Sequence, residues 1–146
     1  MRQVLFLVVL SFTAPVVLAA CDDETAIPGL RTASEPAEVV EGYVTAYNAQ
    51  DIDLAMAFFA DSAVIIQGSD RIEGAAEIRT EILGEFEVHA PGGDAYSISN
   101  LLVAGNTVTW DHRFKGVAHD CRGTGNEAAV EDGQIVTWTV AFIECD

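Results

Sequence analysis

Basic side chains are scarce in this chain of 146 residues: seven Lys and Arg stand against 23 Asp and Glu, which gives a formal net charge of −16. Lys115 is the only lysine. Proteins that bind nucleic acids draw their affinity for phosphate from Lys and Arg, so the composition excludes most modes of nucleic-acid binding. The same deficit argues against attachment to anionic lipid headgroups through a polybasic surface. We interpret the acidic excess as an aid to solubility.

A long hydrophobic run is found only at the N-terminus. Met1-Arg2-Gln3 is a short positive start, and residues 4–17 are almost wholly apolar. The run is too short and too interrupted for a membrane-spanning helix, and it fits a secretory signal peptide. It ends in Leu18-Ala19-Ala20-Cys21, which resembles a bacterial lipobox. We therefore predict a lipoprotein signal peptide over 1–20 and lipidation of Cys21, which would anchor the exported protein to the membrane of the bacterial cell envelope. Ordinary signal cleavage is the alternative.

Cysteine is also rare, with three in the chain. Once Cys21 is assigned to lipidation, Cys121 and Cys145 remain as an even pair in an oxidising compartment. This predicts a disulfide that closes a loop of about 25 residues, with two free thiols as the alternative. Neither cysteine belongs to a C-x-x-C motif or has a histidine directly beside it, so we predict no metal site there. No motif in the chain indicates a cofactor.

Hydrophobic periodicity divides the rest of the chain into a flexible tether over 21–33 and one domain over 34–146. Three helices are predicted first: one from Pro36 to about Tyr47, a short one capped by Asp51 that extends to Phe59, and one from Gly74 or Ala75 to about Phe86. A strand over 63–67 and a turn at 68–70 separate the second helix from the third.

From residue 96 onward the pattern becomes that of strands. We predict strands over 96–104 and 107–118, a loop over 120–126, and a final hairpin in which strands 127–131 and 134–143 flank Asp132-Gly133. The sequence Arg122-Gly123-Thr124-Gly125 is predicted to be part of that loop, because no helix follows to make it a phosphate site. Helices followed by antiparallel strands indicate an α+β fold in which helices cover one face of a sheet.

Alternation along the strands predicts which side chains face the helices. In 107–118, the inward set includes Trp110, His112 and Phe114, whereas Asp111 and Arg113 face outward. In 134–143, the inward set is Val136, Trp138, Val140 and Phe142. Residues seven apart in a strand point to opposite faces, so His112 and His119 cannot share a metal ion. We expect His89 and His119 to lie in solvent.

Four segments resemble the SnoaL-like, ketosteroid-isomerase-like branch of the nuclear transport factor 2-like superfamily: VVEGYVTAYNAQDID at 39–53, FFADSAV at 58–64, GAAEIR at 74–79 and EDGQIV at 131–136. The resemblance runs from Pro36 to the end. It implies a cone-shaped fold in which three N-terminal helices pack on a curved, mainly antiparallel sheet. It further implies that the mouth of the cone holds a small apolar ligand, and that the domain can form a homodimer.

The catalytic residues of ketosteroid isomerases are only partly matched. Tyr43 falls at the position of the tyrosine that donates a hydrogen bond to an oxyanion. The position of the general-base aspartate is occupied by Gln67, whose amide cannot take up a proton at neutral pH. The second oxyanion acid falls within 123–125, where no carboxyl is present. The resemblance therefore argues against steroid isomerisation, and the catalytic set of limonene epoxide hydrolases is not reproduced either.

We predict an envelope-tethered domain whose apolar pocket binds a small hydrophobic molecule. The predicted ligand-binding residues are Tyr43, Tyr47, Gln67, Trp110, His112, Phe114, Trp138 and Phe142. One alternative is an isomerase, dehydratase, cyclase or hydrolase in which His112 is the acid or base and Tyr43 stabilises an oxyanion. Another is a structural or dimerisation module, in which these aromatic residues are only core and His112 is a neutral, satisfied histidine.

Overall fold

The structure of the protein is a computed structural model that describes residues 35–88, 95–115 and 120–146. The predicted signal peptide, Cys21 and the tether lie outside these residues, as do His89 and His119. The elements, in chain order, are α1 (Pro36–Asn48), α2 (Ile52–Met56), β1 (Phe59–Gln67), β2 (Asp70–Glu73), α3 (Ala75–Val88), β3 (Ala95–Ala104), β4 (Thr107–Lys115), β5 (Asp120–Glu131), β6 (Gln134–Val140) and β7 (Ile143–Cys145). None of the helices over the described ranges is long and apolar enough to cross a membrane.

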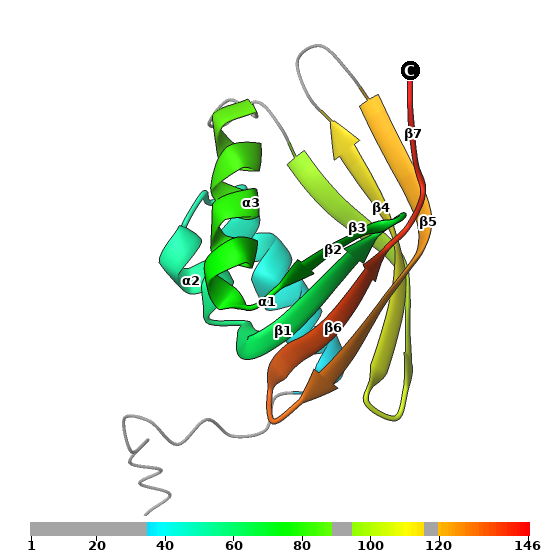
Figure 1. Cartoon of the computed structure of the whole chain (residues 1–146). Coiled ribbons are helices and arrows are strands. Elements are labelled where there is room, and N and C mark those ends of the chain that lie inside the picture. Colours follow the sequence, from blue (N-terminus) through cyan, green and yellow to red (C-terminus); the bar gives the residue numbers. More distant parts are fainter. Residues whose placement is uncertain (1–34, 89–94, 116–119) are drawn as a thin grey trace, which may run out of the picture. The chain divides into compact units, whose positions relative to one another are not determined.

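The seven strands form one curved sheet. Six of them follow the order β2-β1-β6-β5-β4-β3, and β7 pairs with the first residues of β5. Strands β1 and β6 are parallel, whereas the other pairs are antiparallel. The three helices lie against one face of this sheet (Figure 1). This confirms the predicted α+β fold with a curved, mainly antiparallel sheet.

The predicted helices form, with one difference at a boundary. In α1, Pro36 occupies the first turn, and Val40, Tyr43 and Tyr47 lie on a buried stripe. The side chain of Asp51 caps α2 by accepting a hydrogen bond of 3.0 Å from the Leu54 N–H. However, α2 ends at Met56, and Phe59 already belongs to β1, where it pairs with Ile135 of β6. Strand pairing in the core therefore overrides the helical pattern of the apolar run.

The loop predicted over 120–126 is wrong, because these residues form the first half of β5. Two glycines concealed the strand pattern in the sequence. The segment is paired on both sides: Phe114 of β4 lies opposite Cys121, and Cys121 also lies opposite Cys145 of β7. Gly123 is required for packing, since a Cβ added there would lie 2.5 Å from Cε1 of His112.

The last predicted strand is also divided. β6 ends at Val140, the backbone N–H of Ala141 donates to the Asn126 side chain, and the chain continues as β7 on β5. This change of partner breaks the alternation, so the prediction that Phe142 faces inward is wrong, and its side chain is 83% exposed. The disulfide between Cys121 and Cys145 is formed and joins β5 to β7, as predicted.

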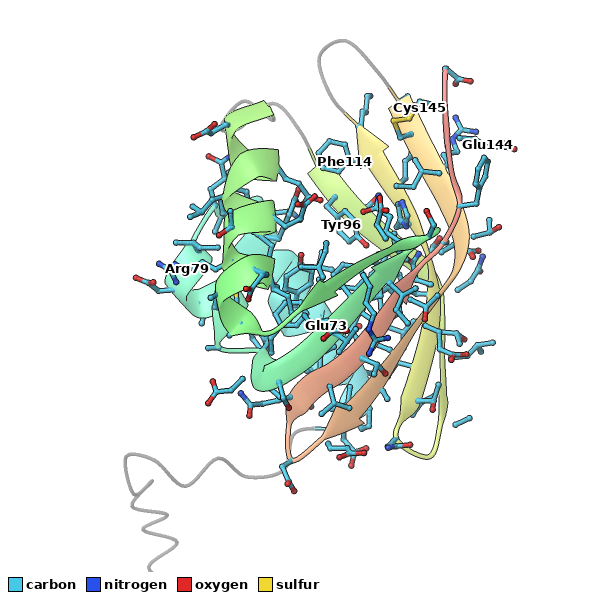
Figure 2. The ribbon with its side chains drawn as sticks, in the orientation of Figure 1. Glu73, Arg79, Tyr96, Phe114, Glu144 and Cys145 are labelled. Atoms are coloured by element: carbon cyan, nitrogen blue, oxygen red, sulfur yellow. A yellow bond between two sulfur atoms is a disulfide. The ribbon has the colours of Figure 1, made fainter. Side chains whose placement is uncertain are left out.

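The core lies between the helices and the concave face of the sheet. Figure 2 shows Tyr96 and Phe114 in the space between the sheet and α3. In the same core, the Tyr43 ring packs edge-on against Phe59 and Trp138, with ring centroids 5.2 and 5.3 Å apart. Both tryptophans are buried and adjacent, at 5.7 Å between centroids, which confirms that they point into the same space.

Two glycine substitutions test the packing of His112. We expect Gly123→Ala to lower the free energy of unfolding by about 1–3 kcal/mol, because its methyl group would displace the imidazole. Gly84→Ala is the matched control: the position is helical, nothing lies within 4 Å of an added Cβ, and we expect a gain of up to about 1 kcal/mol. Urea unfolding measures both. If the two variants are equally stable, the close packing of Gly123 against the His112 imidazole is contradicted.

Candidate functional site

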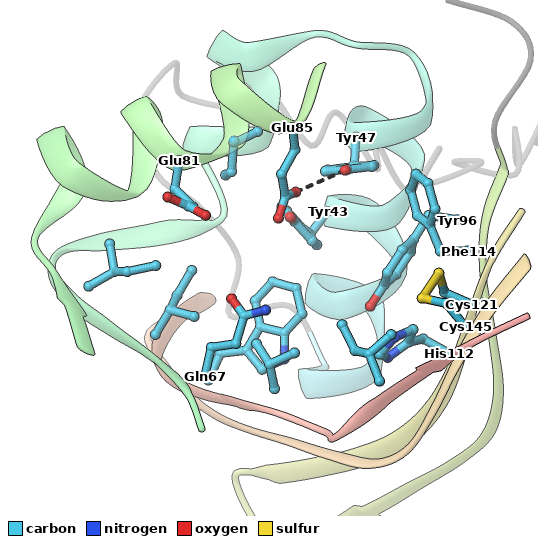
Figure 3. Close-up of a pocket in the computed structure, with 16 residues that line it drawn as sticks. Tyr43, Tyr47, Gln67, Glu81, Glu85, Tyr96, His112, Phe114, Cys121 and Cys145 are labelled. Carbon is cyan, nitrogen blue, oxygen red and sulfur yellow. Dashed lines mark hydrogen bonds between the residues drawn. A yellow bond between two sulfur atoms is a disulfide. The ribbon is translucent and has the colours of Figure 1, made fainter. Parts of the chain in front are cut away.

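A cavity of about 230 Å³ lies between the helices and the concave face of the sheet (Figure 3). Residues of α1, α3 and several strands line it. Its apolar lining includes Ile65, Ile72, Ile82 and Val140. Six of the predicted ligand-binding residues line it as well: Tyr43, Tyr47, Gln67, His112, Phe114 and Trp138.

Two predicted residues do not reach this cavity. Trp110 is buried, but its indole lies beside Trp138, and its N–H is 3.4 Å from the Tyr96 hydroxyl. Trp110 therefore packs against Trp138, which lines the cavity, but does not line the cavity itself. Phe142 is on the surface, because the chain changes its strand partner just before this residue.

Sequence reasoning missed three lining residues that carry polar groups: Glu81 and Glu85 of α3, and Tyr96 of β3. Glu85 was detectable. It follows Ile78 by seven positions and Ile82 by three, so it lies on the apolar stripe of the helix. A carboxylate on the core-facing stripe of an amphipathic helix is the signal, whereas the prediction of that stripe used apolar residues only.

The carboxyl group of Glu85 is held by a phenol. The Tyr47 hydroxyl donates a hydrogen bond of 2.9 Å to Oε2 of Glu85. Burial raises the pKa of Glu85, the bond from Tyr47 partly offsets that shift, and the charge of Glu81 adds to it. Lys and Arg are absent from the described residues that line the cavity, so no side chain there neutralises the carboxylate.

His112 of β4 is tightly enclosed and 6% exposed. Tyr96 stacks on the imidazole, with ring centroids 5.5 Å apart and the planes inclined by 19°. The backbone of Gly123 lies against the ring as well. Burial lowers the pKa of His112, and the hydrogen bond with Asn126 and the carboxylate of Asp111 oppose that shift only in part. The ring is therefore neutral at neutral pH.

Asn126 of β5 determines which ring nitrogen carries the proton. Its Oδ1 accepts from two donors, the Trp138 indole N–H at 3.4 Å and the Ala141 backbone N–H at 3.2 Å. Its Nδ2 therefore faces Nδ1 of His112, at 2.7 Å. Because the amide donates, Nδ1 is the acceptor and the proton of the neutral ring lies on Nε2. This leaves Nε2–H as the donor that His112 can offer to a molecule in the cavity.

Tyr43 of α1 brings a second donor. It is 3% exposed, and rings of Tyr47, Phe59 and Trp138 pack around it. Burial raises the pKa of Tyr43 well above its usual value, so the phenol stays protonated. No hydrogen bond joins its hydroxyl to another residue in the described part of the chain.

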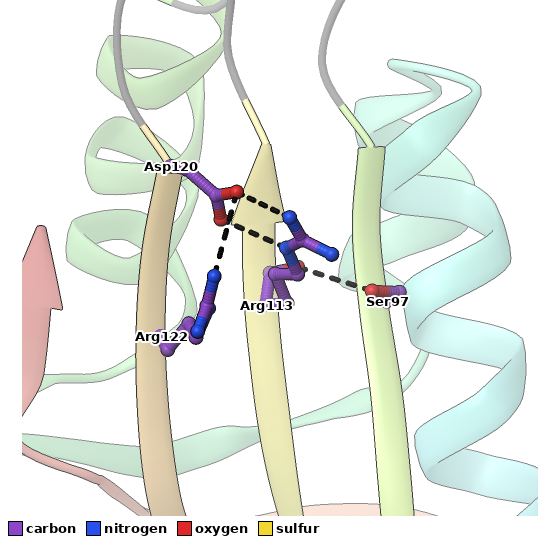
Figure 4. A network of polar contacts seen from close by, with 4 residues as sticks. All are labelled: Ser97, Arg113, Asp120 and Arg122. Carbon is purple, nitrogen blue, oxygen red and sulfur yellow. Dashed lines mark hydrogen bonds and ion pairs between the residues drawn. The ribbon is translucent and has the colours of Figure 1, made fainter. Parts of the chain in front are cut away.

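The polar residues on the opposite face of the sheet form a separate network. Arg113 pairs with Asp120, which also lies near Arg122, and Ser97 donates to the Arg113 carbonyl at 3.3 Å (Figure 4). Arg113 thus faces away from the cavity, as predicted. Across residues 35–88, 95–115 and 120–146, no three His, Cys, Asp or Glu side chains are grouped so as to hold a metal ion.

Comparison with protein families identifies the family to which the domain belongs. Residues 40–143 match the SnoaL-like domain, and the chain belongs to this family. No curated protein matches the chain at a significant level.

Solved structures resemble the domain at low sequence identity. A candidate SnoaL-like polyketide cyclase from Jannaschia sp. CCS1 is 19% identical over 75% of this chain and 85% of its own, with a TM-score of 0.64. A candidate ketosteroid isomerase from Kribbella flavida is 18% identical over 72% and 75%, with a TM-score of 0.62. An epoxide hydrolase from M. tuberculosis, described as LEH-like, is 19% identical over 75% and 82%, with a TM-score of 0.59. These likenesses establish a nuclear transport factor 2-like fold.

The substitution Glu85→Gln tests whether the charge of this carboxylate lowers the stability of the fold. Since the folded-state pKa is raised, ionised Glu85 destabilises the fold as pH rises through that pKa. Glutamine still accepts from Tyr47 but carries no charge. We therefore expect a gain on the order of 1 kcal/mol at pH 7 that disappears in acid, below the unfolded pKa of glutamate.

Thermal unfolding across pH measures this gain, and Glu87→Gln, an exposed position on the same helix, is the control. A loss of stability in Glu85→Gln at pH 7 would contradict the assignment.

Proposed function

We propose that the cavity binds a small, largely apolar molecule that carries a hydrogen-bond acceptor. The hydroxyl of Tyr43 carries this proposal. A buried hydroxyl with no partner costs about 1–3 kcal/mol, and native structures seldom retain one without a reason. An acceptor on a bound molecule would satisfy it.

The rest of the lining supports the same conclusion. Apolar and aromatic side chains surround a few polar groups, the usual composition of a small-molecule site. Nε2–H of His112 provides a second donor on the sheet side of the cavity. A carbonyl or hydroxyl oxygen between Tyr43 and His112 would therefore orient the ligand, while the apolar walls supply most of the affinity.

We also propose that the domain acts outside the cytoplasm, tethered to the cell envelope by lipid on Cys21. The leader sequence supports this, as does the disulfide between Cys121 and Cys145, since such bonds persist in oxidising compartments. In that arrangement residues 22–33 would connect the anchor to the folded domain.

A matched pair of neutral probes tests the binding site. We expect cyclohexanone to bind with higher affinity than methylenecyclohexane, which has the same shape but lacks a strong acceptor. Tyr43→Phe should lower the affinity for the ketone about two- to tenfold, the effect of one hydrogen bond, and leave the hydrocarbon unchanged. Ligand-observed NMR titration measures both. If neither probe shows saturable binding, the proposal is refuted.

One observation favours an enzyme as the second candidate. Glu85 is a carboxyl group with a raised pKa in the same cavity as two donors, and Figure 3 shows it on the helical side and His112 on the sheet side. Here Glu85 would be the general base, and Tyr43 and His112 would stabilise an oxyanion. His112 is not the base in this arrangement, because Asn126 already occupies its Nδ1.

Proton exchange tests this candidate without knowledge of the substrate. If Glu85 is a base, the protein should accelerate exchange of the α-protons of cyclohexanone for deuterium, observed by NMR in D2O. Glu85→Gln should reduce the acceleration at least about a hundredfold, and Glu87→Gln should not. If wild-type protein binds the ketone and does not accelerate exchange, the cavity is a binding site only.

A further inference from the structure

The charge within the cavity has one sign. Among the described residues that line it, Glu81 and Glu85 are the acidic groups, Lys and Arg are absent, and His112 is neutral. The whole chain carries a formal charge of −16, so its long-range field has the same sign. Such a field attracts cations and repels anions before any contact is made.

Aromatic rings surround the same space. Tyr43, Tyr47, Tyr96, Phe114 and Trp138 line the cavity and come from α1, β3, β4 and β6. Neighbouring rings form a continuous cluster: centroids are 5.9 Å apart for Tyr43 and Tyr47, and 5.6 Å for Tyr47 and Tyr96. The face of an aromatic ring is electron-rich and attracts an organic cation within about 6 Å.

We propose that the preferred ligand of this cavity is a small organic cation, an amine or quaternary ammonium compound whose charge lies beside Glu85 and among the tyrosine rings. The inference rests on the proposed small-molecule site and specifies the chemistry of its ligand. An acceptor oxygen elsewhere on the ligand would still meet Tyr43 and His112.

The surroundings of Glu85 explain why a cation is favoured over a neutral molecule of the same shape. The titratable groups that face Glu85 are Tyr43 and Tyr47 from α1, Tyr96 from β3 and Glu81 from its own helix. None of these is positively charged. A neutral ligand would desolvate the carboxylate without providing an opposite charge, whereas a cation would supply that counter-charge.

Choline and its uncharged carbon isostere, 3,3-dimethylbutan-1-ol, test the proposal, because the two differ in charge and match in shape. Isothermal titration calorimetry on the protein at pH 7 should show choline binding at least about tenfold more tightly. Glu85→Gln should remove most of that preference by weakening choline alone. Glu87→Gln, exposed on the same helix, should change neither affinity.

The outcomes distinguish this inference from the proposed function. Equal affinity for the pair, or tighter binding of the isostere, overturns the preference for cations and leaves a neutral-ligand site. A preference for choline that persists in Glu85→Gln also overturns it, because the charge would then be recognised elsewhere. If both compounds fail to bind, the cation site is refuted, and the ketone titration then decides independently whether the cavity binds small molecules.

Discussion

One buried amide, the side chain of Asn126, connects the strands that form the floor of the cavity. It is 0% exposed and contacts the His112 ring, the Trp138 indole, the Trp110 carbonyl and the Ala141 backbone N–H. Its oxygen and nitrogen are thus both satisfied inside the core, where an unpaired polar group is costly. An apolar side chain at this position would leave several partners unsatisfied at once, so the amide specifies this arrangement.

Two features of the site follow from that amide. The bond to Ala141 holds the chain where it leaves β6, which directs the next residues onto β5, and there the disulfide keeps Ile143 and Cys145 at the cavity wall. The bond to His112 assigns the ring proton to Nε2. A neutral histidine fixed in this way has its donor at Nε2, because the hydrogen bond at Nδ1 sets the tautomer. In the proposed enzyme we therefore assign the acid–base role to Glu85 in place of His112.

Periodicity predicted the fold and the inward direction of His112, Trp110 and Trp138, because side chains alternate regularly while a strand keeps one partner. It failed where the partner changes: the switch after Val140 placed Phe142 in solvent. It also failed at Gly123, where the requirement comes from an imidazole on another strand and leaves no local pattern. Glu85 was missed for a different reason: its position on the apolar stripe of the helix is visible in the sequence, but the prediction of that stripe considered apolar residues only.

The carboxylate that lines the cavity differs in position from the general base of the ketosteroid isomerases that the chain resembles. In that resemblance the base falls on Gln67, at the end of β1, whereas the carboxylate here comes from Glu85 on α3. A ligand held by Tyr43 would therefore meet the carboxylate on its helical side. The three solved structures are less than 20% identical to the chain, so their likeness establishes the fold and does not assign the ligand. Under the proposal of an organic cation, selectivity would come from the lining, in which the described charges are negative and aromatic rings lie beside aliphatic side chains.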